Sequence, residues 1–123
     1  MSESDAIVVF LTAAHGEEAA RIAEMLVGAR LAACVQILPP MESVYRWQGR
    51  IERQSEVLLI AKTIQSKFEE LEREVIALHS YETPEIIAVP IVAGSKRYLD
   101  WLDESVQLNS SSATARSTRD SRR

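Results

Sequence analysis

The chain has 123 residues, of which 46% are hydrophobic and 26% are charged, so we expect one globular domain with a core of its own. Its formal net charge is −4 at pH 7, and four arginines after Gln107 leave the rest of the chain more acidic still, which argues against nucleic acid as a partner. No apolar run approaches the roughly 18 residues of a membrane helix, so we expect no membrane partner. A single cysteine excludes an internal disulfide, which fits a cytoplasmic location.

The first expected element is a strand over 6–11, AIVVFL, a continuous apolar run that is typical of a central strand buried on both faces. A helix is predicted from about Glu17 to Ala29, because its apolar residues recur at helical spacing. We place Glu18 on the solvated side of this helix. Residues 31–38, LAACVQIL, form the next predicted strand, which two prolines end because proline cannot donate a ladder hydrogen bond.

The stretch that organises the chain is 42–63, which predicts a long β-hairpin arm around Gln48-Gly49-Arg50. Polar and apolar residues alternate on the way in, as in a pleated strand, and Gly49 supplies the positive φ of a tight turn. The return strand ends in an apolar run, so we expect the base of the arm to be buried on both faces. Near the tip lie three large apolar residues that should not remain in water, so we predict that they form an interface with another copy of the chain: Tyr45, Trp47 and Ile51.

A second helix is expected to begin at Ser66, where the residues SKFE have the form of a capping box. After the loop HSYETPE, a strand is predicted over 86–92, and Ser95 can cap a last helix that extends to Val106. The Ser/Thr/Arg-rich remainder cannot bury enough apolar surface to fold. We therefore divide the chain into a folded domain, 1–106, and a disordered tail, 107–123.

The order of these elements is β-α-β, arm, β-α-β and a terminal helix. This order predicts an α+β fold of the ferredoxin-like class, also called the split βαβ sandwich, with a four-stranded antiparallel sheet and two helices on one face. The long β-hairpin arm and the extra C-terminal helix are additions to this plan. The fold serves many unrelated functions and by itself specifies none.

Four stretches together resemble the CutA divalent-cation tolerance family: LAACV at 31–35, SVYRWQGRI at 43–51, HSYETPEII at 79–87 and YLDWL at 98–102. The resemblance extends from about Ile7 to Val106. It implies a cytoplasmic homotrimer of ferredoxin-like subunits, related in shape to the PII signalling proteins. It also implies a role in tolerance of divalent metal ions, copper (Cu²⁺) especially, without an organic cofactor.

The residues that we name as candidate metal ligands are His79, Glu82 and Cys34. An imidazole combined with carboxylates suits a borderline divalent ion. Two alternatives stay open at this point. His79 could instead bond a backbone carbonyl near the end of the second helix while Glu82 holds the loop, and Cys34 could be an inert buried thiol that becomes a ligand only if it faces a cleft between subunits.

Lys62 and Glu85 are candidate cleft residues. Lys62 ends an otherwise apolar strand, so it could meet an anionic ligand in a polar cleft, although a plain lysine at a sheet edge explains it as well. Tyr45 and Trp47 could provide a platform on which a ligand stacks. We prefer packing in the subunit interface, because large aromatic residues are the usual anchors of interfaces.

The sequence contains no constellation of residues that indicates an enzyme. It has no glycine loop that could hold a phosphate and no nucleophile motif, and its only asparagine is Asn109, in the tail. We therefore predict a non-enzymatic, homotrimeric protein that binds metal ions. Two alternatives remain: a PII-like signalling protein that binds a small anionic ligand between subunits, and a trimeric scaffold for an unidentified protein partner.

Overall fold

The computed structural model describes residues 5–107, so the predicted tail lies outside the described residues except for Gln107. None of the helices in this range is long and apolar enough to span a bilayer. The elements in chain order are β1 (Ala6–Ala13), α1 (Gly16–Gly28), β2 (Cys34–Ile37), β3 (Met41–Trp47), β4 (Arg50–Ile64), the short 3₁₀ helix η1 (Gln65–Lys67), α2 (Phe68–Leu78), β5 (Ile86–Pro90) and α3 (Lys96–Val106).

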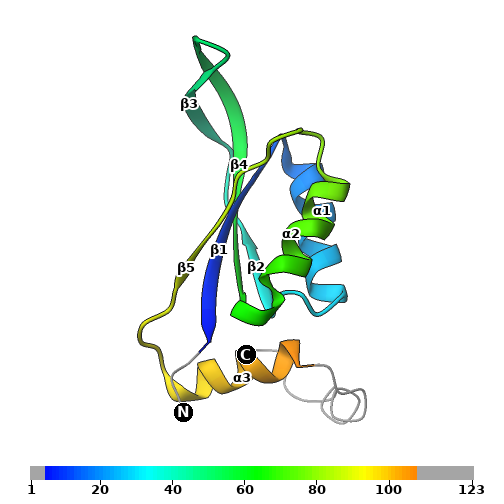
Figure 1. Ribbon diagram of the computed structural model, residues 1–123, viewed down its shortest axis with the longest axis vertical. Coiled ribbons are helices and arrows are strands. Elements are labelled where there is room, and N and C mark those ends of the chain that lie inside the picture. The colour runs from blue at the N-terminus through cyan, green and yellow to red at the C-terminus, as the bar shows by residue number, and fades with distance from the viewer. Residues whose placement is uncertain (1–4, 108–123) are drawn as a thin grey trace.

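The sheet has the strand order β2-β4-β1-β5, and all of its neighbouring strands are antiparallel. Helices α1 and α2 cover one face of this sheet, and α3 crosses its lower end (Figure 1). Among the described strands, β3 pairs only with β4, and the two extend beyond the body as an arm (Figure 1). This arrangement confirms the predicted ferredoxin-like fold with its arm and its additional helix.

The main core lies between the sheet and the helices α1 and α2. Alternate residues of the two central strands are fully buried there, among them Leu11 and Leu59, and they pack against Ile22 of α1 and Leu71 of α2. A smaller cluster closes the other end of the sheet beneath α3. It consists of Ala6, Ile64, Leu102 and Val106, with partly buried residues around them.

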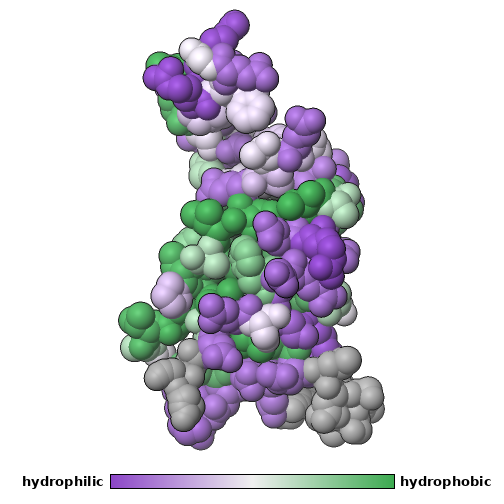
Figure 2. Space-filling view, viewed as in Figure 1, coloured by the Kyte–Doolittle hydropathy of each residue, from purple (hydrophilic) through white to green (hydrophobic). Residues whose placement is uncertain are grey.

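None of the helices within residues 5–107 packs over the middle of the other face of the central strands (Figure 1). The register places Phe10 beside Ile60 and Val8 beside Lys62, and all four side chains are only half-buried. The prediction that these strands are buried on both faces is therefore wrong for a single chain, because α1 and α2 pack on the same side. Figure 2 shows hydrophobic side chains over the middle of the molecule and hydrophilic ones over the helices and the arm tip.

The arm is a β-hairpin with a two-residue turn. Gln48 and Gly49 have φ angles of 50° and 80°, and Trp47 pairs directly with Arg50, which is the geometry of a type I′ turn. The turn is thus one residue shorter than predicted, since Arg50 already belongs to β4. Strand β4 runs without interruption from the arm into the centre of the sheet, so the arm is a direct extension of the core.

Two predicted helix starts have different outcomes. Ser95 caps α3 as predicted, because its side chain accepts a hydrogen bond from the Tyr98 amide at 3.2 Å. The capping box at Ser66 is wrong: Ser66 lies inside η1, and the residue before α2 makes no capping bond through its side chain. A capping serine needs an extended backbone, and the extended residue that precedes this turn is Ile64.

The strand predicted over 31–38 is shorter, beginning at Cys34. Leu31 and Ala32 are buried in the turn after α1, where both of their amides bond to the Leu26 carbonyl and continue the end of the helix. Strand β5 likewise ends at Pro90 rather than at residue 92. The local hydrophobicity correctly predicted that Leu31 and Ala32 are buried, but it placed them in a strand instead of in the turn after α1.

Candidate functional site

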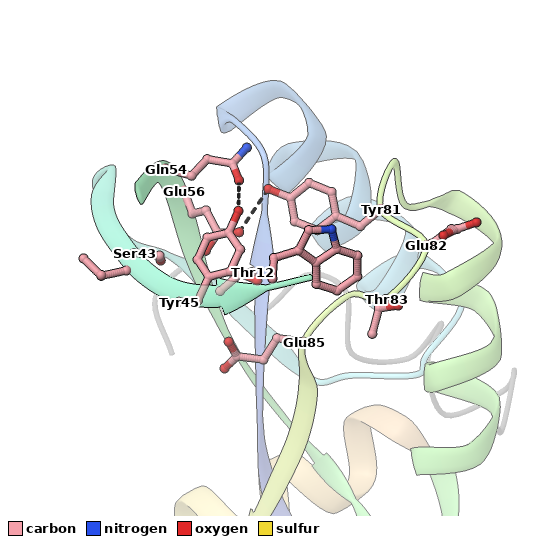
Figure 3. Close-up of a pocket in the computed structure, with 11 residues that line it drawn as sticks. Thr12, Ser43, Tyr45, Gln54, Glu56, Tyr81, Glu82, Thr83 and Glu85 are labelled. Atoms are coloured by element: carbon pink, nitrogen blue, oxygen red, sulfur yellow. Dashed lines mark hydrogen bonds between the residues drawn. The ribbon is translucent and has the colours of Figure 1, made fainter. Parts of the chain in front are cut away.

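A pocket of about 610 Å³ opens where the base of the arm meets the loop between α2 and β5 (Figure 3). Strands β3 and β4 form one wall and the loop forms the other, with the end of β1 between them. The two segments therefore approach each other although they are far apart in the sequence. The lining residues are Thr12, Ser43, Val44, Tyr45, Trp47, Gln54, Glu56, Tyr81, Glu82, Thr83 and Glu85.

Two tyrosines are fixed by hydrogen bonds to side chains of β4 (Figure 3). The Tyr45 hydroxyl donates to Gln54 Oε1 at 2.5 Å, and the Tyr81 hydroxyl donates to Glu56 Oε2 at 3.0 Å. Burial, together with the hydrogen bond to Glu56 and its negative charge, raises the pKa of Tyr81 to about 12. Tyr81 therefore remains a protonated donor at neutral pH and holds Glu56 in place.

The pocket is acidic. Among residues 5–107, its lining includes the carboxylates Glu56, Glu82 and Glu85 and contains no lysine, arginine or histidine. Glu82 points away from Glu56, and Glu85 lies on the side of Tyr45 (Figure 3). Within residues 5–107, no three side chains of histidine, cysteine, aspartate or glutamate gather closely enough to hold a metal ion.

A buried carboxylate, Glu18, holds in place the loop between α2 and β5 that forms one wall of the pocket. Its Oε1 accepts a hydrogen bond from the Ala14 amide at 2.8 Å, and its Oε2 accepts one from the Ser80 amide at 2.7 Å. Glu18 is 2% exposed, so its predicted position on the solvated side of the helix is wrong. The first turn of α1 lies beneath the loop after α2, and Glu18 ties that loop to the turn that precedes α1.

The electrostatics of Glu18 follow from these contacts. Burial alone would raise the pKa of its carboxyl group, but the hydrogen bonds from Ala14 and Ser80 outweigh burial and lower the pKa from 4.5. The charged form is therefore the form that the folded protein stabilises.

We expect Glu18 to make stability depend on pH in the acid range. Because folding lowers its pKa from 4.5, Glu18 stabilises the folded state above that pH, and the contribution is lost as the pH falls through the lower pKa of the folded state. Urea denaturation from about pH 6 down to about pH 3 should show this loss in the parent and a flatter dependence in Glu18→Gln. Equal slopes for the two proteins would contradict the assignment.

The structure uses both ring nitrogens of His79, whose side chain is fully buried. Nε2 lies 2.7 Å from the Thr12 carbonyl oxygen, and Nδ1 accepts a hydrogen bond from the Tyr81 amide at 3.0 Å. With Nδ1 as acceptor, Nε2 carries the proton and donates it to Thr12. The expected carbonyl partner is thus present, but it belongs to β1. A metal could reach His79 only by breaking one of these two bonds.

The structure does not bring the predicted site residues into one cluster. Cys34 and Lys62 are cross-strand partners on β2 and β4, and neither lines the pocket. The Lys62 ammonium donates to the side-chain oxygen of Gln36, a neighbour on the same open face of the sheet. Glu82 and Glu85 do line the pocket, whereas His79 lies beneath it.

Sequence reasoning missed Glu56, the most deeply buried carboxylate of the pocket, at 8% exposed. A signal was available, because Gln54 and Glu56 alternate along β4 and so lie on the same face of the strand as Tyr45, the cross-strand neighbour of Glu52. The partner of Glu56 was not predictable in this way, since Tyr81 comes from a distant loop.

Comparison with known proteins gives a consistent result. The sequence profile described as "CutA1 divalent ion tolerance protein" matches residues 7–105. The "Divalent-cation tolerance protein CutA" of Thermus thermophilus is 49% identical over 98 residues, which are 80% of this chain and 95% of that protein. The chloroplastic "Protein CutA" of Arabidopsis thaliana is 48% identical over 101 residues, which are 82% of this chain and 56% of that relative.

Solved structures agree with the sequence comparison. The divalent cation tolerance protein from Thermus thermophilus superposes with a TM-score of 0.82 at 47% identity, covering 83% of this chain and 99% of the other. The structure named as a periplasmic divalent cation tolerance protein CutA from Archaeoglobus fulgidus has a TM-score of 0.81, also at 47% identity, with the same coverage.

Proposed function

Because this chain belongs to the CutA1 divalent ion tolerance protein family, we propose that it acts in the response to divalent metal ions as a non-enzymatic binding protein, with copper as the first metal to test. The observation that carries the proposal is the charge of the pocket, to whose lining the described part of the chain contributes three carboxylates and no basic residue. A surface of this kind raises the local concentration of cations. The same charge counts against an anionic ligand at this place, and so against the PII-like alternative there.

The metal site that we propose is completed between copies of the chain. Two exposed carboxylates at the pocket, Glu82 and Glu85, are free to turn toward a neighbouring subunit. Hard and borderline cations need several oxygen or nitrogen ligands, and a single chain does not gather three of them among residues 5–107.

We also propose the cytoplasm as the location, supported by the unpaired Cys34.

Calorimetry with Cu²⁺ and Zn²⁺ tests the metal role. We expect binding to the parent, and a loss of affinity of at least about tenfold in the double variant Glu82→Gln/Glu85→Gln, since changing even a group that only supports a ligand has that effect. The matched control is Glu70→Gln/Glu74→Gln, which removes the same charge from exposed positions of α2. No heat with either metal on the parent would overturn the metal role and leave the scaffold alternative.

Cys34→Ser separates the thiol from the carboxylates. A soft thiolate prefers Cu⁺, whereas carboxylates and imidazoles accept Cu²⁺ and Zn²⁺. With the carboxylates as ligands, we expect Cys34→Ser to bind Cu²⁺ like the parent in the same calorimetric assay. A loss of Cu²⁺ binding in this variant would instead place the metal on the open face of the sheet, beside Lys62.

We propose that the protein is a homotrimer. Support comes from two apolar surfaces that the single chain leaves in contact with water. One is the open face of the sheet around Phe10 and Ile60. The other is the arm, where Tyr45, Trp47 and Ile51 are 37%, 45% and 69% exposed. Surfaces of this kind mark interfaces in soluble proteins.

A further inference from the structure

We propose that the pocket at the base of the arm is the docking site for the arm of a second copy of the chain, which inserts Arg46 and Ile51 and pairs Arg46 with Glu85. The inference rests on the homotrimer proposed above and not on the metal role. It goes beyond the homotrimer because it names the two surfaces that meet and the residues that each copy contributes. The distribution of residues over the arm and the charges of the two surfaces support it.

The two faces of the arm carry different residues. Cross-strand partners share a face and successive residues of a strand alternate, so Tyr45 and Trp47 lie together on the face that lines the pocket. Arg46 and Ile51 are cross-strand partners on the opposite face, and neither lines the pocket of its own chain. We call this opposite face the outer face. Because it is turned away from the pocket, an arm cannot fill the pocket of its own chain.

The outer face and the pocket have opposite charges. The part of the chain that the structure describes gives the pocket three carboxylates and no basic side chain. Arg46 is exposed and forms no ion pair with the described residues, whereas Arg53, on the same outer face, is paired with Glu42 at 3.1 Å. Glu85 is an exposed carboxylate on the Tyr45 side of the pocket (Figure 3), which makes it the partner that we assign to Arg46. A guanidinium group binds a carboxylate through charge-assisted hydrogen bonds.

The apolar residues of the two surfaces also complement each other. Ile51 is 69% exposed and lies directly beside Arg46, so the two side chains can enter a pocket together. Tyr45 and Trp47 would be covered by the arriving arm, which is the burial that an interface between copies requires. A volume of about 610 Å³ can hold a small molecule and therefore has room for two side chains. The three predicted interface residues thus have two roles: Tyr45 and Trp47 receive the neighbouring arm, and Ile51 is inserted.

The proposed contact joins two different surfaces, so it is a head-to-tail contact. Contacts of this kind form a closed ring when the rotation from one copy to the next closes. In a ring of three copies, every pocket receives an arm and every arm is bound. The arm extends beyond the body of its own chain (Figure 1), as an element that reaches a neighbour must.

Charge reversal tests the docking by light scattering over a dilution series. EDTA is present throughout, because a divalent ion at Glu82 and Glu85 would neutralise the same charge. Arg46→Glu brings a carboxylate to the acidic pocket, and like charges that face each other across an interface are strongly unfavourable. We expect the dissociation constant of the assembly to rise at least about tenfold. The matched control is Arg73→Glu, the same charge change at an exposed position of α2, which should assemble like the parent.

The reverse change in the pocket tests the pairing of Arg46 with Glu85. Glu85→Arg alone should also weaken assembly by about tenfold or more. When Arg46→Glu and Glu85→Arg are combined in one chain, each arm meets an arginine of its neighbour, so the affinity should return to that of the parent. If the double variant assembled no more tightly than Arg46→Glu, the pairing would be overturned.

A covalent test shows directly which surfaces meet. Two forms of the full chain, both with Cys34→Ser, carry Arg46→Cys and Glu85→Cys respectively and are co-expressed and then oxidised. Each form has a single cysteine, so a disulfide can form only between copies. We expect a linked pair that contains one chain of each form, and no linked pair when either form is oxidised alone. A trimer without the mixed pair would overturn the docking.

The docking and the homotrimer fail in different ways. A parent that stays monomeric over the whole dilution series would overturn both. A trimeric parent whose Arg46→Glu variant has the same dissociation constant would overturn the docking and leave the homotrimer in place. Arg46 is exposed, so its replacement should leave the fold of the single chain intact.

Discussion

Replacing Glu18 with alanine should lower the free energy of unfolding by about 3 kcal/mol, the largest effect that we expect from a single side chain near the pocket. The variant removes the acceptor of both the Ala14 and the Ser80 amides, each of which donates to Glu18 at under 3 Å. Donors left without a partner away from water cost more than the net value of the bonds themselves. Urea denaturation at pH 7 measures the change.

The matched control is Glu17→Ala. Glu17 precedes Glu18 in the same first turn of α1 but is exposed, so its replacement should change stability by no more than about 0.5 kcal/mol. If Glu18→Ala lowered the free energy of unfolding as little as Glu17→Ala, the Glu18 carboxylate would not be the group that holds the loop after α2 against α1.

Ile60→Glu should convert the proposed trimer into single chains. The Ile60 side chain is half-buried within one chain, so a glutamate there can still reach water in a monomer, whereas an interface over the open face would bury its charge without a partner. Static light scattering should give three times the chain mass of 13.8 kDa for the parent and one chain mass for the variant.

The matched control for assembly is Ile76→Glu, which places the same charge at a 47% exposed position of α2, on the helix side of the sheet. It should retain the mass of the parent.

Trp47→Asp tests the arm in the same assay and should also dissociate the trimer, because Trp47 is one of the three predicted interface residues. A parent that is monomeric, or an Ile60→Glu variant with the parent's mass, would contradict the proposed assembly.

Much of the fold was predictable because it follows from local patterns. The alternation around Tyr45 and Trp47 and the glycine at position 49 predict the arm, and the structure has it with a turn that is one residue shorter than predicted. Ser95 predicts the start of α3 in the same way, since a capping side chain bonds to an amide three residues away. The capping box at Ser66 failed because the tighter turn of η1 competes with the cap for the same residues.

The candidate site was predictable only in its parts. Tyr45, Trp47, Glu82 and Glu85 were singled out from their segments, and all four line the pocket. The sequence did not show that these residues line one pocket, because periodicity describes the side chains of one segment at a time. The ligand set of His79, Glu82 and Cys34 remains a prediction, and the structure adds that His79 already bonds through both ring nitrogens.

The sequence by itself determined which residues share a face of each strand or helix, since side-chain direction follows from the backbone repeat. Only the tertiary structure decided what covers each face. Glu18 belongs by helical periodicity to a solvated side, yet it is buried because a loop 62 residues away lies over it. Phe10 and Ile60 belong by composition to a buried strand, yet they are half-buried because both packed helices cover the opposite face. Burial depends on contacts between segments distant in the chain, and a local pattern contains no information about which segments meet.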